Sequence, residues 1–182
     1  YNEFYGEVPE LTVSLTTVPD PAKIQFNTGR LHVELLPLGP ERTGAVQAAW
    51  AAVREQRARY SDFPDHRVML WEMQRPVRAV SLALESAGLQ PSAVDEYGSC
   101  VRDGYKVDAS NSRLTARVTM AFPSSWTTVG SPERRESSAL HHINDGALAQ
   151  YSAALEQRGW LCTKHRSPHS AYGYLIVIPR RA

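Results

Sequence analysis

The chain contains only two cysteines, Cys100 and Cys162, in 182 residues. That number is too small for the disulfide scaffold of a small secreted protein. In an oxidising compartment the two could form one bridge, and the alternative is two unpaired, small apolar side chains. The sequence also lacks any run that approaches the roughly 20 apolar residues needed to cross a bilayer. We therefore expect a soluble protein with no membrane span.

An excess of one charge and the common cofactor motifs are also missing. Lysine plus arginine nearly balances aspartate plus glutamate, which leaves a net charge of +1. No global field therefore draws the chain onto nucleic acid or an acidic membrane. The sequence has no G-x-G-x-x-G, P-loop, G-x-S-x-G or EF-hand pattern. We accordingly expect no cofactor, and the lack of catalytic motifs favours a protein that is not an enzyme.

Lysine is scarce, whereas arginine and alanine are abundant. This bias is typical of high-GC coding and predicts a bacterial or phage origin. The sequence begins at Tyr1 without a methionine, and residues 1–30 lack the basic-then-apolar layout of a signal peptide. We expect a cytoplasmic protein, with a mature exported form as the alternative.

The length and the residue balance predict one folded unit. A chain of 182 residues lies within the usual size of one domain, and 42% apolar with 21% charged residues is ordinary for globular proteins. Strand-like and helix-like patterns together predict a single α+β domain over residues 1–182, with a mostly antiparallel sheet and helices packed on one face. Residues 1–10 are expected to form an arm, and the proline- and glycine-containing residues 122–135 an internal loop.

Alternating apolar and polar residues predict the strands. Residues 11–18 and 31–36 alternate in this way and are expected to pair with each other. Residues 104–108 and 113–120 are expected to form a hairpin through a polar turn. Residues 172–178 are almost continuously apolar, which favours a central strand buried on both faces.

Three-and-four spacing of apolar residues predicts the helices. Residues 41–60 and 136–158 show this spacing. Residues 65–89 contain Pro76, which must interrupt a helix, so two helical pieces are expected; a short strand within residues 66–75 is the alternative. The predicted core comprises Val13, Leu15, Val33, Leu35, Trp50, Val53, Val80, Leu84, Val118, Leu155, Leu175 and Val177.

One internal similarity links the two halves of the chain. Residues 81–88 resemble residues 152–159, and each ends in glycine and precedes a predicted hairpin. Two explanations stay open: repeated α-β-β units, and the frequent use of glycine after the last turn of a helix.

The only cluster of metal-ligand side chains along the sequence is Cys162, His165 and His169, in the segment joining the last two predicted strands. Thiolate and imidazole groups at this C-x2-H-x3-H spacing can reach one zinc ion, although a fourth ligand would have to come from His141, His142, Asp145 or Cys100. Zinc is the one metal that this pattern suggests. The alternative is a polar hairpin connection with no bound metal.

Three functions follow from these patterns. Because no catalytic pattern is strong, the leading hypothesis is a non-catalytic binding or assembly protein that acts through a protein–protein surface. The first alternative is a metal-assisted hydrolase or thiol-dependent enzyme centred on Cys162, His165 and His169. The second is a nucleic-acid-binding module that uses the arginines of the middle helices, Arg54, Arg57, Arg59, Arg67, Arg75 and Arg78.

Overall fold

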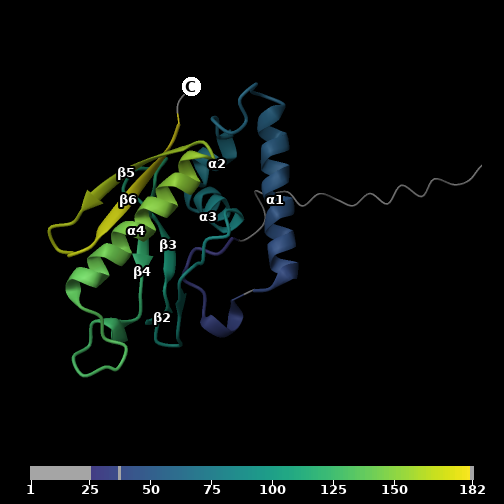
Figure 1. Cartoon of the computed structure of the whole chain (residues 1–182). Helices are drawn as coiled ribbons and strands as arrows, with labels where there is room; N and C mark the ends of the chain where they lie inside the picture. Colours follow the sequence, from purple (N-terminus) through teal and green to yellow (C-terminus); the bar gives the residue numbers. More distant parts are fainter. Residues whose placement is uncertain (1–25, 37, 181–182) are drawn as a thin grey trace, which may run out of the picture.

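The computed structural model describes residues 26–36 and 38–180 (Figure 1). Its helices are α1 (Pro40–Ala58), α2 (Leu70–Gln74), α3 (Pro76–Ser86) and α4 (Ser137–Glu156), with short 3-10 turns at Val33–Leu35 and Ser124–Trp126. No helix among the described residues is both long and apolar enough to cross a membrane.

Within the described residues, six strands form two antiparallel sheets. The small sheet pairs β1 (Ala93–Val94) with β2 (Cys100–Arg102). The main sheet has the order β3-β4-β6-β5, formed by β3 (Gly104–Ala109), β4 (Ala116–Ala121), β6 (Gly173–Pro179) and β5 (Trp160–Arg166). The predicted α+β class is confirmed, and so is the hairpin of β3 and β4.

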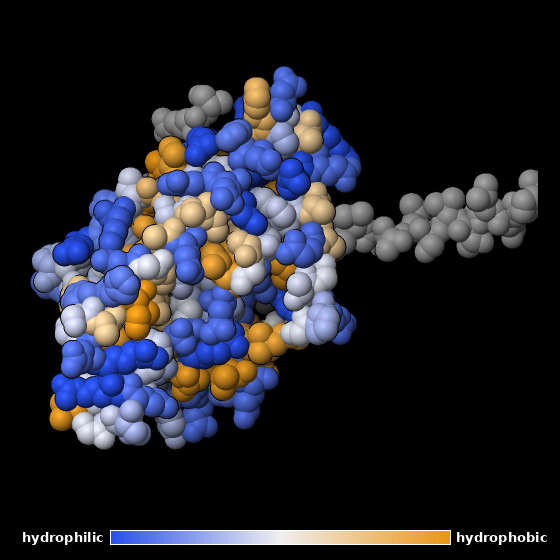
Figure 2. All heavy atoms as spheres, viewed as in Figure 1, coloured by the Kyte–Doolittle hydropathy of each residue, from blue (hydrophilic) through white to orange (hydrophobic). Residues whose placement is uncertain are grey.

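Helices α3 and α4 cover one face of the main sheet, whereas α1 lies on the outer side of α3 (Figure 1). Apolar residues at alternate strand positions pack against α3 and α4, because side chains on a strand alternate between its two faces. This core includes Tyr105, Val118, Trp160 and Val177. On the side where α4 lies, hydrophobic and hydrophilic residues are interspersed over the surface (Figure 2).

Most of the predicted core inside the described residues is confirmed. Trp50 is only partly buried, but the other members on the helices and the main sheet are at most 2% exposed: Val53, Val80, Leu84, Val118, Leu155, Leu175 and Val177. The predicted core residues Val13 and Leu15, like the arm and the strand at residues 11–18, lie outside the described residues.

Proline fixes where two helices begin. Pro40 and Pro76 each occupy the first turn of a helix, where the missing N–H costs no hydrogen bond. Arg75, with φ −129° and ψ 59°, separates α2 from α3. Two helical pieces are therefore confirmed, and a short strand within residues 66–75 is wrong.

The predicted strand at residues 31–36 is wrong. Only His32 makes a β-bridge, to Val94, and the chain then turns through Val33–Leu35. Val33 and Leu35, predicted core residues, are 41% and 74% exposed. The His32 ring accepts a hydrogen bond from the Glu34 amide (3.2 Å), and this local bond stabilises a turn where the alternating pattern alone offered no neighbouring strand.

The last strand is interior in the sheet, as predicted, but is not buried on both faces. Strand β6 lies between β4 and β5. Its residues Leu175 and Val177 face the helices and are buried, whereas Ile178, on the other face, is 37% exposed. The physical reason is that both covering helices pack on the same side. The α3-β3-β4 and α4-β5-β6 segments occupy matching halves of the sheet, but a repeated unit stays a prediction.

Candidate functional site

The structure does not bring the three predicted metal ligands together. Cys162 and His165 lie within β5 rather than in the connection, and His169 lies in the turn that follows. Because their positions differ by an odd number of residues, Cys162 and His165 project from opposite faces of β5. Within the described part of the chain, no three His, Cys, Asp or Glu residues are grouped so that they could hold a metal. Zinc binding here remains a prediction.

The side chains around this segment have other neighbours. Asp145 accepts a hydrogen bond from Lys164 (2.7 Å), which holds the pKa of that carboxyl below its usual range. The His141 ring packs against Tyr172, with centroids 5.0 Å apart. Cys100 and Cys162 are both free thiols, so the unpaired alternative is the one found.

Cys162 faces α4, and its burial raises the pKa of the thiol to about 12. A thiolate is the reactive form of cysteine, so this environment opposes use of Cys162 as a nucleophile or metal ligand near neutral pH.

We expect iodoacetamide to alkylate Cys162 in the Cys100→Ala variant about a thousand times more slowly in the folded protein than in the unfolded protein at pH 8. The reason is that a rise in the thiol pKa from 9.0 to about 12 lowers the fraction of thiolate by that factor. The neutral thiol also stabilises the folded state fully below about pH 9, and this contribution is lost as pH rises towards 12. Mass spectrometry after timed quenching measures the rate. Equally fast alkylation of folded and urea-unfolded protein would contradict the burial.

The second face of the main sheet is not covered by a helix among the described residues. Leu161 and Ile178 on this face are 39% and 37% exposed. We call it the open face, and its side chains come from alternate positions of all four strands: Lys106, Asp108, Arg117, Thr119, Leu161, Thr163, His165, Tyr174, Ile176 and Ile178.

Three flat side chains form a stacked row across the open face. The Arg117 guanidinium lies 4.0 Å from the centroid of the Tyr174 ring. That ring stacks in turn on His165, with centroids 5.6 Å apart and an interplanar angle of 18°. The row joins β4, β6 and β5 and places the Arg117 cation on the same face as the exposed Leu161 and Ile178.

A hollow of about 470 Å³ lies at the end of the sheet where β6 finishes. Arg67 and Arg180 line it together with Leu114 and Ile178. Its walls therefore combine positive charge with exposed apolar surface.

Strand β5 forms one edge of the sheet, and its outer side has no strand partner among the described residues. The Arg180 amide donates to the Gly159 carbonyl (3.0 Å), and Pro179, opposite Trp160, has no N–H to donate. Since hydrogen-bonded and non-hydrogen-bonded pairs alternate in an antiparallel ladder, Cys162, Lys164 and Arg166 point their backbone N–H and C=O groups outwards. We call this side of β5 the free edge.

The arginines of the middle helices are largely engaged within the fold. Arg57 is fully buried in an ion pair with Glu72, and its guanidinium also donates to the carbonyls of Pro64 (3.1 Å) and Arg158 (2.8 Å). Arg54 pairs with Asp65, and Arg59 with Glu55. Arg75 and Arg78 also have interaction partners. The predicted nucleic-acid surface therefore loses most of its unpaired charge.

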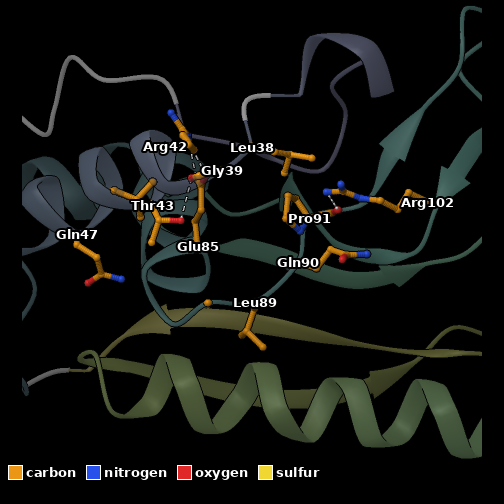
Figure 3. Close-up of a pocket in the computed structure, with 12 residues that line it drawn as sticks. Leu38, Gly39, Arg42, Thr43, Gln47, Glu85, Leu89, Gln90, Pro91 and Arg102 are labelled. Carbon is orange, nitrogen blue, oxygen red and sulfur yellow. Dashed lines mark hydrogen bonds and ion pairs between the residues drawn. The ribbon is translucent and has the colours of Figure 1, made fainter.

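A separate cavity of about 220 Å³ lies between the start of α1, the end of α3 and Arg102 of β2 (Figure 3). Its apolar wall is formed by Leu38, Val46, Leu89 and Pro91. Sequence patterns did not indicate this cavity, because its walls come from segments far apart in the chain.

No protein-family model, curated protein or solved structure matches the chain. The site must therefore be interpreted from its geometry. The free edge presents backbone donors and acceptors that have no strand partner in the described chain, and the open face next to it has no covering helix among the described residues. The apolar run of residues 172–178 was the sequence feature on this face, and it predicted burial on both sides instead of an open face.

Proposed function

We propose that this protein is a non-catalytic binding protein that captures an extended, acidic segment of a partner protein as an additional strand on the free edge of β5. The observation that carries the proposal is the free edge itself: seven consecutive residues, Trp160–Arg166, whose outer side has no strand partner in the described chain, next to an uncovered sheet face. Backbone hydrogen bonds would provide affinity, and the adjoining side chains would provide selectivity.

Charge selects the partner. Arg166, the last residue of β5, forms no ion pair with a carboxylate among the described residues. Carboxylates on an incoming strand would lie near Arg166, and charge-assisted hydrogen bonds are stronger than neutral ones.

Apolar side chains on the same strand would complete the contact. Leu161 is exposed beside the free edge, and Ile178 is exposed at the hollow where β6 ends. Alternate side chains of an added strand point to the open face, so a sequence that alternates acidic and apolar residues fits both requirements.

The test uses a capped peptide of alternating glutamate and valine as the probe and a Lys164→Pro variant. Residue 164 points its N–H outwards, so proline removes a hydrogen bond to the added strand without removing one from the β5–β6 ladder. We expect chemical-shift perturbations centred on β5, and a loss of affinity of about tenfold or more in the variant.

The matched control is Lys164→Ala, which loses the side-chain bond to Asp145 but keeps the backbone N–H. We expect its affinity to stay within about threefold of the parent chain, since an exposed ion pair contributes little. Equal binding by Lys164→Pro, or a preference for a single-stranded oligonucleotide of equal charge, would refute the proposal. An unchanged thermal midpoint in both variants shows that the fold is retained.

A further inference from the structure

The cavity between α1 and α3 has the shape of a small-molecule site. It is concave, about 220 Å³ in volume, and one wall is apolar (Figure 3). A few polar groups converge on the opposite side, the combination usual in ligand pockets. It lies away from the free edge, so it forms a second and independent site.

The charges around this cavity do not cancel. Arg42 and Glu85 form a two-point ion pair at 2.8 and 2.9 Å, and the Asn27 amide also donates to Glu85 (3.3 Å). Arg102 donates to the carbonyl of Pro91 (3.1 Å), but it has no carboxylate partner among the described residues, and its buried Nε has no hydrogen-bond partner. The lining therefore carries one unmatched positive charge.

The neighbouring polar side chains already donate hydrogen bonds to backbone carbonyls. Gln47 donates to Ser86 and Gln90 to Asp103, both at 2.9 Å, and Thr43 donates to Gly39 at 3.1 Å. An incoming anion would thus find its main donor in Arg102, whose guanidinium is directed towards Pro91 at the cavity wall (Figure 3).

We propose that this cavity binds a small organic carboxylate, with the apolar body against Leu38, Val46 and Leu89 and the carboxylate on Arg102. A guanidinium suits a carboxylate because it offers parallel N–H donors in a fixed plane. An unpaired, partly buried charge is also costly, so a bound carboxylate offsets the cost of leaving Arg102 without a counterion.

Benzoate is the probe, and the uncharged benzamide is its matched control. In ¹H–¹⁵N spectra we expect saturable benzoate shifts at the Leu89 and Gln90 amides and at the Arg102 Nε. Binding of benzamide should be at least about tenfold weaker, since it lacks the charge. Arg102→Gln should weaken benzoate binding about tenfold or more, whereas Arg113→Gln, the same charge loss on an exposed turn, should change it less than about twofold.

A second variant tests the same site in case Arg102→Gln does not fold. Leu38 is 63% exposed at the rim of the cavity, so Leu38→Glu should leave the fold intact while repelling the anion several-fold. Absence of saturable shifts, equal binding of benzoate and benzamide, or insensitivity to both variants would overturn the proposal. None of these outcomes affects strand capture at β5, which involves different residues.

Discussion

Arg57→Leu is expected to destabilise the protein by about 3–5 kcal/mol. Arg57 and Glu72 are 0% and 1% exposed, and their two-point ion pair links α1 to α2. Leucine would leave the Glu72 carboxylate buried with the Met69 amide as its remaining donor (2.7 Å). It would also orphan the carbonyls of Pro64 and Arg158, which accept from Arg57. Urea denaturation followed by far-UV circular dichroism measures the loss.

Two comparisons separate the buried charge from mere loss of a side chain. Arg54→Leu removes an arginine of the same helix whose ion pair with Asp65 is about half exposed, and it should cost less than about 1 kcal/mol. The double variant Arg57→Leu/Glu72→Leu removes both charges and should recover a large part of the stability. If the single and double variants unfold at the same urea concentration, the unpaired carboxylate is not the cause.

Gly29→Ala is also expected to destabilise the protein, by about 3 kcal/mol or more. Gly29 has φ +81°, and an added Cβ would overlap the Tyr105 carbonyl oxygen and lie 2.7 Å from the Ser92 Oγ. This close approach exists because the chain crosses β3 here. The Val107 amide donates to the Thr28 carbonyl (2.9 Å), and the Ser92 hydroxyl donates to the Gly29 carbonyl (2.8 Å). Differential scanning calorimetry of the variant measures the effect.

Two other glycines separate the contribution of the positive φ from that of the steric clash. Gly98 has φ +79° with no atom within 4 Å of an added Cβ, so Gly98→Ala should cost about 1–2 kcal/mol through the backbone alone. Gly44 lies in α1 with open space around it, and Gly44→Ala should stabilise by about 0.5–1 kcal/mol. If Gly29→Ala lowers the stability no more than Gly98→Ala does, β3 moves to accommodate the methyl group without a steric cost.

Local chemistry made part of the fold predictable. Pro76 must interrupt a helix wherever it occurs, and the alternation that ends in Val118 and Met120 is a strand pattern on its own. The failure at Val33 and Leu35 has the same origin, since alternation describes a strand without showing which segment pairs with it.

The candidate sites depended on tertiary contacts that the sequence does not reveal. Arg57 was one of six arginines grouped in the middle helices, but its partner Glu72 follows 15 residues later, across a turn. The stacked row draws Arg117, Tyr174 and His165 from three strands, and no short motif contains them. Continuous apolarity in β6 also hides which of its faces is covered, because Leu175 and Ile176 are equally hydrophobic.

The cations along β5 have a consequence for solubility. Two copies of this protein that met β5 to β5 would set Lys164 and Arg166 of one against the same residues of the other. Lysines and other charges on a bare strand are a known means by which natural proteins prevent sheets from joining into aggregates. The cations that would attract an acidic strand are thus also expected to oppose pairing between two β5 edges.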